Sequence, residues 1–401
     1  MKIKSIEAFT ITVPAKPQKT APRRPSWVDS AEVANPMSRF PEYKPFRGLW
    51  TAKFKRVACV VTAEDGTWGL GITDNGAAVL SIINDHFAEH LTGRDVMATE
   101  YLWDMMYRMV SPYGAWGLSS YAISAVDLAL WDLKGKLLNQ PVYALLGGPS
   151  HEKLPCYATG YDTDWHLECG FTGTKLPCPF GTASGLEGLI AIEELVAKTR
   201  DMIGPKIELM LDCWMAFDVE FAIRLAERLR SYNMKWIEDC LIPEDFEGFD
   251  EMRRRLPWLT LATGEHWYTP LPYAQAVARR SVDILQPDVM WMGGVTAIQK
   301  VCHLAEAAGI AVIPHAGLND AYGQHICHAF PGIPSGEFFV GSAPGVPLDE
   351  CPTQRNPGRM AVPVDGMFAP LDDPGFGLGL TLDEVYAMKD DKTPGSGGYG
   401  G

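Results

Sequence analysis

Several features that would place this chain in a membrane or outside the cell are missing from its sequence. None of its apolar runs approaches the length of a membrane span. The first residues, MKIKSIEAFTITVPA, are interrupted by Glu7 and lack the hydrophobic core of a secretory signal peptide. The nine cysteines include no CxxC pair, which is typical of reduced core cysteines rather than of a disulfide framework. We therefore expect a cytoplasmic protein with no membrane partner.

Positive charge is also in short supply. The chain carries 35 Lys and Arg against 49 Asp and Glu, a formal net charge of −14 at pH 7. This balance argues against nucleic acid or an anionic membrane surface as a partner. It does not exclude an anionic small substrate, because a bound divalent cation and a lysine can reverse the field locally.

The sequence does contain a series of hydrophobic runs that end in polar residues. Asp212, Glu238 and Glu265 end three successive runs at nearly equal spacing. A strand, a crossover helix and two short loops need about that many residues, so each carboxylate falls at the C-terminal end of a strand in a repeating β/α unit. Continuous apolar runs are typical of strands buried on both faces of a parallel sheet. Eight such runs predict a (β/α)-type barrel between residue 154 and about residue 340: LPCYATG, GTKLPCP, IELMLDCW, MKWIEDCL, LTLATGEH, VDILQPDV, AVIPHA and GEFFV.

At 401 residues the chain exceeds one barrel. Residues 1–140 combine a first strand, a hairpin turning at Asp65-Gly66 and helical stretches, and they predict an α+β domain. The barrel is expected over residues 141–345. Residues 346–401 are expected to form a return segment that packs on the first domain, with a flexible Gly-rich tail from about residue 393.

The polar residues at the strand ends suggest a metal site beside a catalytic pair. Three carboxylates brought together repel one another unless a cation lies between them, and an all-oxygen shell suits Mg²⁺. We predict that Asp212, Glu238 and Glu265 bind one Mg²⁺ per subunit. Asp288 and His315 end later runs, one module apart, and would lie side by side at the barrel mouth. A carboxylate bonded to one ring nitrogen fixes the histidine tautomer and raises its basicity.

Strings spread in order over more than 300 residues resemble one known family. The carboxylate trio, the His315 and Asp288 pair and the helix AVDLALWDLKGK resemble the mandelate racemase subgroup of the enolase superfamily. The strings LMLDCWM, KWIEDCL, TGEH, QPDV, IPHA, GEFF and WVDSAEVANPMSRF are similar to the L-rhamnonate dehydratase family. The resemblance implies an enolase-like fold, which is a modified TIM (β/α)-barrel with an N-terminal α+β capping domain. It also implies Mg²⁺-assisted removal of a proton α to a carboxylate.

The resemblance further implies roles for single residues. His315 would abstract the C2 proton of the substrate and Asp288 would orient it. Lys175 would place an ammonium group beside the substrate carboxylate and the metal. Glu337 would donate a hydrogen bond to the enediolate oxygen, which requires a protonated form and a raised pKa. The residues expected to bind substrate are His266, Trp27, Arg47 and Trp214.

Two positions depart from the family pattern. The second barrel strand reads TKLP from residue 174, so only Lys175 of a Lys-x-Lys pair is present, which disfavours a racemase with two bases. Ser26 precedes Trp27 where the family places a histidine, which leaves the identity of the sugar open. Trp27 lies in a long loop, residues 21–50, which we expect to act as a lid with an arginine reaching substrate hydroxyls.

The sequence therefore predicts an acid sugar dehydratase that converts an aldonate to its 2-keto-3-deoxy product, with L-rhamnonate as the first candidate. L-lyxonate or L-mannonate would need only different contacts near C5 and C6. An epimerase or racemase is disfavoured, and a non-catalytic relative would have no need of the full set of ligands, dyad and lysine. The expected partners are a small acid sugar and, in a homo-oligomer, further copies of the chain.

Overall fold

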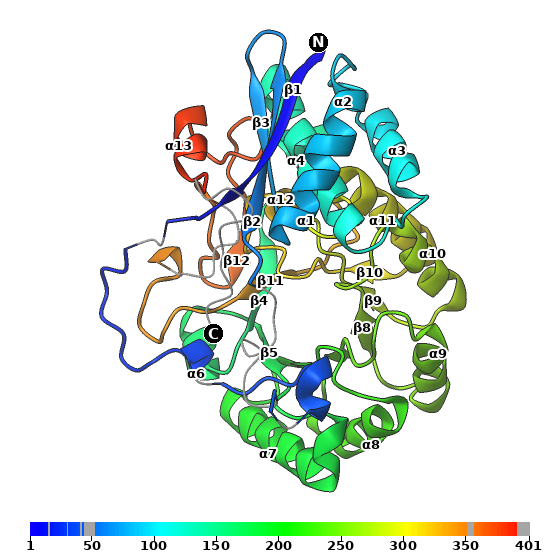
Figure 1. Cartoon of the computed structure of the whole chain (residues 1–401). Helices are drawn as coiled ribbons and strands as arrows, with labels where there is room; N and C mark the ends of the chain where they lie inside the picture. Colours follow the sequence, from blue (N-terminus) through cyan, green and yellow to red (C-terminus); the bar gives the residue numbers. More distant parts are fainter. Residues whose placement is uncertain (15–16, 30, 41, 44–52, 351–356, 391–401) are drawn as a thin grey trace.

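The computed structural model describes residues 1–401 except 15–16, 30, 41, 44–52, 351–356 and 391–401 (Figure 1). A parallel sheet in the middle of the chain contains all eight predicted hydrophobic runs as strands. Their hydrogen-bonded order is β10-β9-β8-β7-β6-β5-β4-β11. Strands β4 to β10 therefore lie side by side in chain order around the barrel, and β11 pairs with β4. Their bounds are β4 Leu154–Thr159, β5 Gly173–Pro177, β6 Glu208–Asp212, β7 Trp236–Glu238, β8 Leu261–Thr263, β9 Ile284–Leu285, β10 Ala311–Val312 and β11 Gly336–Phe339.

The register of the barrel strands sets the position of the polar residues at their ends. Pro177 pairs with Asp212, and Asp212 pairs with Glu238. Because parallel strands in register end at the same level, the ends of β5, β6 and β7 form one edge. The interior of the barrel below this edge is filled by a cluster with side chains from several strands: Tyr157, Met210, Trp236, Ala262, Ile284 and Ile313.

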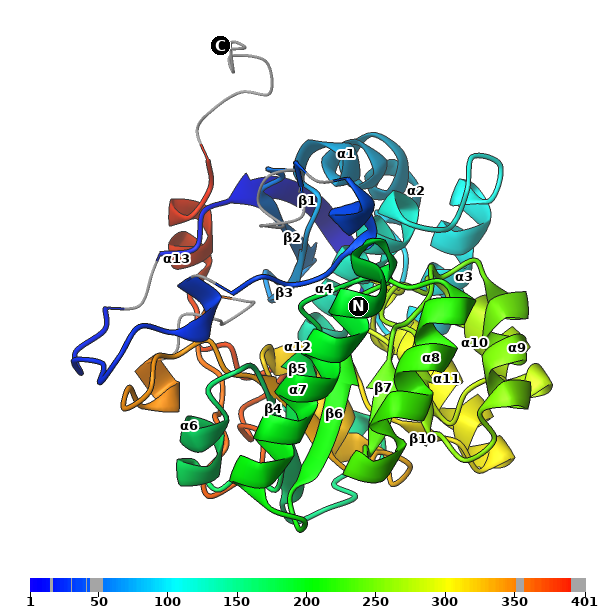
Figure 2. The same ribbon diagram turned by 90° about the horizontal axis from the view of Figure 1, so that it is seen from below.

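Helices follow most of the barrel strands and cover their outer face. Figure 1 shows α7, α8, α9 and α10 around the outside of the strands, and Figure 2 shows α7 and α8 beside β6 and β7. Aspartates cap three of the barrel helices; Asp218, for example, accepts from the backbone N–H of Phe221 at the start of α8. The bounds are α6 Thr163–Glu168, α7 Gly185–Ile203, α8 Val219–Leu229, α9 Phe246–Arg255, α10 Pro270–Arg279, α11 Gly294–Ala308 and α12 Ala321–Ala329.

The N-terminal part of the chain forms a three-stranded antiparallel sheet in the order β1-β2-β3 with helices on it (Figure 1). The predicted hairpin at Asp65-Gly66 joins β2 to β3, and Gly66 has φ +89° there. Helix α4 lies so close to β3 that a Cβ on Gly71 would come within 1.9 Å of the Ala125 carbonyl oxygen. The elements are β1 Ile3–Ile11, β2 Arg56–Ala63, β3 Trp68–Thr73, α1 Gly76–Ser81, a π-helix Ile82–Phe87, α2 Ala88–Leu91, α3 Thr99–Val110, α4 Leu118–Leu138 and α5 Val142–Leu145.

The C-terminal segment ties the two parts together. Strand β12, Met367–Phe368, pairs antiparallel with β4 of the barrel. Helix α13, Leu382–Ala387, lies against β1, where the ring of Tyr386 stacks on Phe9 with centroids 5.2 Å apart. The predicted architecture, a modified (β/α)-barrel with an N-terminal α+β capping domain, is confirmed.

The described residues also bear on two features of composition. None of their helices has the length and apolarity needed to cross a membrane. All of the described cysteines are free, and all but Cys169 are buried. They pack in the core, as the scattered spacing predicts.

Candidate active site

A histidine and an aspartate meet at the C-terminal edge of the barrel, as predicted. Nδ1 of His315, after β10, lies 2.8 Å from Oδ2 of Asp288, after β9. Asp288 is fully buried, whereas the His315 side chain keeps 20% of its surface exposed. The other ring nitrogen, Nε2, lies 3.6 Å from Oε2 of Glu265. The pair can therefore fix the tautomer of His315 and leave Nε2 at the barrel mouth.

The charges around His315 favour its protonated form. Burial opposes protonation of the imidazole, but Glu265 and the hydrogen bond to Asp288 outweigh it and raise the pKa of His315 to about 9. A histidine with a raised pKa beside a carboxylate is a group that can both take up and deliver a proton.

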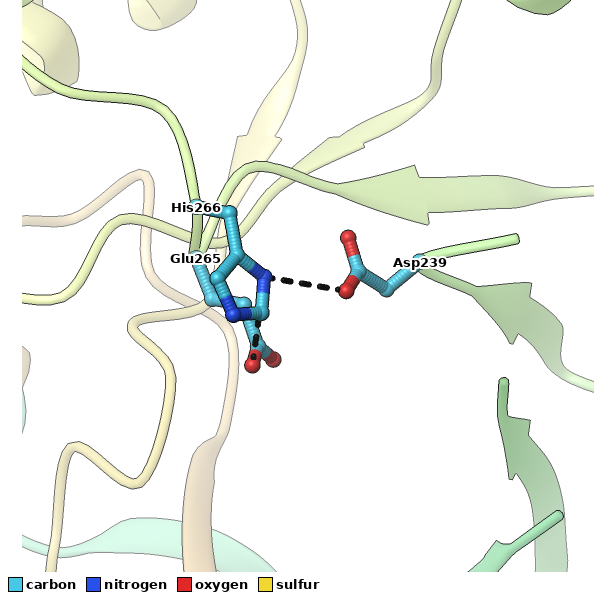
Figure 3. A group of neighbouring side chains, drawn as sticks. All are labelled: Asp239, Glu265 and His266. Carbon is cyan, nitrogen blue, oxygen red and sulfur yellow. Dashed lines mark hydrogen bonds and ion pairs between the residues drawn. The ribbon is translucent and has the colours of Figure 1, made fainter. Parts of the chain in front are cut away.

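A second histidine and aspartate pair faces the other carboxylate oxygen of Glu265 (Figure 3). Nδ1 of His266 is 3.1 Å from Oδ2 of Asp239 and 3.6 Å from Oε1 of Glu265. Thr263 donates to the other oxygen of Asp239 at 2.9 Å. Asp239 was not predicted as a site residue, because strict alternation after Glu238 would turn its side chain away from the barrel. Its backbone has φ +51°, a left-handed conformation that breaks the alternation.

Lys175 lies at the centre of a buried ionic network. Its Nζ pairs with Oε1 of Glu238 and, at 2.8 Å, with Oε1 of Glu337. Gln286 and the indole of Trp236 donate to Oε2 of Glu238 at 2.7 and 2.8 Å. The Lys175 and Glu238 side chains have no exposed surface. A buried charge is tolerated only when it is paired and hydrogen-bonded, and this network meets both conditions.

The expected raised pKa of Glu337 is wrong. Burial would raise it, but the charges of Lys175 and His315 outweigh burial and lower the pKa of Glu337 to about 2. The polar partners of the Glu337 carboxylate among the described residues are donors: besides Lys175, Thr159 Oγ1 donates at 2.5 Å and the backbone N–H of Ala316 at 2.8 Å. Glu337 is therefore an ionised acceptor and cannot donate a hydrogen bond in this state.

The three predicted metal ligands lie close enough to repel one another. Burial and the neighbouring charge of Asp212 raise the pKa of Glu238, although Lys175 opposes them. Burial and the charge of Glu238 likewise contribute to a raised pKa for Glu265. Three carboxylates with this mutual repulsion have the chemistry to hold a hard cation.

The tightest group of possible metal-binding atoms among the described residues is a different one. One atom each from Asp239, Glu265 and His266 lies within 4.8 Å of the others (Figure 3). Of the predicted trio, only Glu265 belongs to this group, and Glu238 pairs with Lys175 instead. The imidazole nitrogen and the Asp239 to His266 hydrogen bond make this group less suited to Mg²⁺ than the all-carboxylate trio. The donor chemistry of Asp212, Glu238 and Glu265 fits Mg²⁺.

An aromatic wall lines the two histidines. The ring of Trp291 lies 5.0 Å from His315 and 6.0 Å from His266, measured between centroids. Tyr121, from α4 of the capping domain, lies 6.0 Å from Trp291. Trp214, a predicted substrate residue, packs edge-on against His266 at 5.9 Å. Trp291 and Tyr121 were not predicted, because an aromatic residue in a strand-end loop or on a buried helix carries no sequence signal that separates a site wall from a core.

The described part of the predicted lid around Trp27 docks over the ends of β4 and β11. The Trp27 indole donates to the carbonyl of Val340 at 2.8 Å. A Cβ on Gly160 would lie 2.5 Å from the Trp27 indole nitrogen, so only glycine lets the ring approach here. Ser26 is buried and its hydroxyl donates to the carbonyl of Gly341 at 2.9 Å. Ser26 therefore serves to hold the lid.

The arginines at the start of the lid contact barrel acids. Arg24 forms ion pairs of 2.9 Å with Asp162 and 2.6 Å with Asp164. Arg23 pairs with Glu168 at 2.7 Å. These ion pairs hold the segment that contains Arg23 and Arg24 against α6 and the loop before it. The predicted contact of an arginine with substrate hydroxyls stays a prediction, and Arg47 lies outside the described residues.

Comparison with known proteins places this site in a family. The chain matches the mandelate racemase and muconate lactonizing enzyme N-terminal domain over residues 37–147 and the enolase C-terminal domain-like model over residues 167–385. It belongs to the mandelate racemase and muconate lactonizing enzyme family of the enolase superfamily. The resemblance found in the sequence is thereby confirmed.

Within this family the chain is similar to L-rhamnonate dehydratases. It is 40% identical over 385 residues to L-rhamnonate dehydratase of Saccharopolyspora erythraea, covering 95% of this chain and 97% of that protein. The structure of rhamnonate dehydratase from Gibberella zeae complexed with Mg has 34% identity and a TM-score of 0.89, covering 97% of this chain and 96% of the other. A racemase from Streptomyces coelicolor with bound magnesium has 26% identity and a TM-score of 0.75, covering 97% and 100%.

Proposed function

We propose that this protein is a Mg²⁺-dependent sugar acid dehydratase and that L-rhamnonate is its substrate. The reaction removes the C2 proton and the 3-hydroxyl and gives a 2-keto-3-deoxy acid. The observation that carries this proposal is the His315 and Asp288 pair, with Nε2 of His315 facing Glu265 at 3.6 Å at the barrel mouth. The 40% identity to an L-rhamnonate dehydratase over 95% of the chain supports it.

Asp212, Glu238 and Glu265 would hold the Mg²⁺, one ion per subunit. Bound there, the ion would neutralise the substrate carboxylate and the negative charge that develops on its oxygens as the C2 proton leaves. Lys175 adds a buried positive charge beside this position. Glu337, ionised and saturated with donors, holds Lys175 in place.

His315 performs the proton transfers. Asp288 accepts a hydrogen bond from Nδ1, so Nε2 is the ring nitrogen that exchanges protons. A Mg²⁺ ion held by Glu265 would offset the negative charge that raises the pKa of His315, so that Nε2 could be unprotonated and take the C2 proton. The same imidazolium then gives a proton to the 3-hydroxyl, the C3–O bond breaks, water leaves, and the resulting enol becomes the 2-keto acid. Strand β5 carries Pro177 where a second lysine would stand. His315 would then serve both the C2 proton and the 3-hydroxyl, so both leave from one face of the substrate and the elimination is syn.

Substrate contacts are proposed for three of the predicted residues. Trp27 would shield the site from the lid side, and Trp214 and His266 would line the opposite wall, with Asp239 holding His266. Arg47 stays a prediction. Trp291 would add a further wall beside His315.

We expect modest selectivity at the far end of the sugar. The Ser26 hydroxyl already donates to Gly341 and leaves no donor for a distal hydroxyl, so contacts at C5 and C6 contribute little discrimination. L-rhamnonate should be preferred over L-lyxonate by less than about a hundredfold in kcat/KM. A panel of aldonates assayed for 2-keto-3-deoxy acid tests both the activity and this ratio. A larger preference would show that other contacts read the distal end, and no product from any aldonate would contradict the proposed function.

The lid contacts give a second prediction. Exposed ion pairs contribute about 0.2–1 kcal/mol each, so Arg24→Ala should open the lid part of the time and raise KM several-fold with a smaller change in kcat. KM of the wild type should rise with salt, and KM of the variant should rise less. Lys235→Ala is the matched control, because it removes a pair of similar exposure with Glu208, at the opposite end of β6. Equal KM values for Arg24→Ala and Lys235→Ala would contradict a closing role for Arg24.

A sugar acid epimerase is the second candidate, since the His266 and Asp239 pair offers another possible base. An epimerase would exchange the C2 hydrogen and accumulate the C2 epimer with no loss of water. Analysis of the products therefore separates the two candidates.

Three expectations about the whole chain remain proposals. They are the domain bounds 1–140, 141–345 and 346–401, a cytoplasmic location and a homo-oligomeric state. Exposed Leu186 and Ile190, one turn apart on α7, support a contact between copies. Sedimentation analysis tests the oligomeric state.

A further inference from the structure

The turn after β9 carries two side chains of the proposed active site. Asp288 begins it and Trp291 follows three residues later. Within the turn, Oδ1 of Asp288 accepts from the backbone N–H of Met290 at 2.9 Å, and the Asp288 carbonyl accepts from Trp291 and Met292 at 3.1 and 2.9 Å. The direction of the Asp288 carboxylate is therefore tied to the conformation of the whole turn.

Three elements of the capping domain form hydrogen bonds with this turn. Thr73, at the end of β3, donates to the carbonyl of Met290 at 2.8 Å. The Trp103 indole on α3 donates to the carbonyl of Gly293 at 2.8 Å. Ser124 on α4 accepts from the backbone N–H of Gly293, also at 2.8 Å. All of these contacts are buried, so water does not compete for them.

Asp127 caps the helix that follows the turn. Helix α11 has no side-chain cap of its own and begins with two glycines of positive φ, Gly293 and Gly294. Asp127, one turn after Ser124 on α4, accepts from the backbone N–H of Thr296 at 2.9 Å and from its hydroxyl at 2.6 Å. A Cβ on Gly294 would lie 2.5 Å from the Asp127 carboxylate, so glycine is needed for this approach. The cap of a barrel helix is thus supplied by the capping domain.

We propose that Ser124 and Asp127 are positioning residues for the His315 and Asp288 pair. By fixing the start of α11 they hold the turn from Asp288 to Gly293 in the conformation that directs the Asp288 carboxylate at Nδ1 of His315. The capping domain then sets the geometry of the acid–base pair as well as covering the site. The catalytic consequence rests on the proposed function; the structural one does not.

The test compares Asp127→Asn with Asp132→Asn. Asp132 lies on the same helix and is equally buried. It accepts from the backbone N–H groups of Leu70 and Phe376 at 2.9 and 3.0 Å, neither of which belongs to the turn. Both variants replace a buried carboxyl acceptor by an amide and should lower thermal stability. Asp132 also pairs with Lys136 at 2.7 Å, so Asp132→Asn should lower it at least as much as Asp127→Asn. Only Asp127→Asn should lower kcat, by about tenfold to a hundredfold with KM within about twofold, since misplacement of a catalytic group costs up to about a hundredfold.

A readout that needs no turnover accompanies the kinetics. The proton on Nδ1 of His315, hydrogen-bonded to Asp288, should give a downfield NMR signal that disappears in His315→Asn. At fixed pH and saturating Mg²⁺ the signal should shift or broaden in Asp127→Asn and stay unchanged in Asp132→Asn. Ser124→Ala removes a single bond to the turn and should produce a smaller change of the same kind. It serves as the second variant if Asp127→Asn does not fold.

The outcomes separate the inference from the proposed function. The same signal and the same kcat in Asp127→Asn and Asp132→Asn would overturn the positioning role, even in an active dehydratase. A shifted signal in Asp127→Asn alone, in a protein that converts no aldonate, would support the positioning role and reject the proposed function.

Discussion

His315→Asn should abolish both exchange of the C2 hydrogen with solvent and dehydration, by at least the 10²- to 10⁴-fold typical of losing a general acid or base. Asparagine keeps a polar side chain at the position but cannot take a proton from carbon. Asp288→Asn should leave the fold intact and lower kcat strongly, because an amide opposite Nδ1 favours the wrong tautomer of His315. Proton NMR of the substrate in D₂O measures exchange, and assay of the 2-keto-3-deoxy acid measures dehydration.

The prediction for His315 needs a control variant and a test for any other residue that could act as the base. His303→Asn alters an exposed histidine on α11, on the outside of the barrel, and should leave both rates unchanged. If His315→Asn exchanges the C2 hydrogen at nearly the wild-type rate, another base exists. Lys175 is a poor candidate because it is wholly buried between Glu238 and Glu337. His266, held by Asp239, would be the first to test.

Removal of the metal should have a comparably large effect. A chelator should reduce activity to below about a hundredth of its value and Mg²⁺ should restore it, since the charge that develops on the substrate carboxylate would otherwise meet three repelling carboxylates. Mg²⁺ should also raise the melting temperature, because it binds the folded protein only. Glu238→Gln should lose both responses. Glu208→Gln, a carboxylate exchange at the opposite end of β6, should keep them.

Two results would change the metal assignment. Full activity in excess chelator, with no tightly bound metal left, would remove the need for a cation. Loss of Mg²⁺ binding in Asp239→Asn but not in Asp212→Asn would move the ion to the group of Asp239, Glu265 and His266 (Figure 3). Isothermal titration with Mg²⁺ decides between the two sets with no substrate present.

Much of the barrel could be predicted because each of its strands leaves a recognisable pattern in its own short stretch of sequence. Strands buried on both faces must be apolar throughout, so the run before Glu238 stands out in the sequence. The strand register follows from the repeat, which is why Asp212 and Glu238 end neighbouring strands at one level. The meeting of His315 with Asp288 follows from the same repeat. Residues at successive strand ends are brought together by any closed parallel barrel.

The parts that could not be predicted depend on conformations and contacts that the repeat does not set. Asp239 contacts His266 because its backbone adopts a positive φ. No neighbouring residue in the sequence predicts that conformation. The pKa of Glu337 depends on Lys175, from a strand far away in the chain, and the sequence identified both residues without their contact. The pairing of Arg24 with Asp162 and Asp164 depends on how a long loop docks. A sequence cannot fix that docking.

The most direct test of the proposed activity is to follow L-rhamnonate by proton NMR in D₂O with the full chain and Mg²⁺. The predicted result is loss of the C2 signal together with formation of 2-keto-3-deoxy-L-rhamnonate that carries deuterium at C3, and no reaction with His315→Asn. Recovery of unchanged L-rhamnonate, or accumulation of its C2 epimer with no loss of water, would contradict a dehydratase acting on L-rhamnonate.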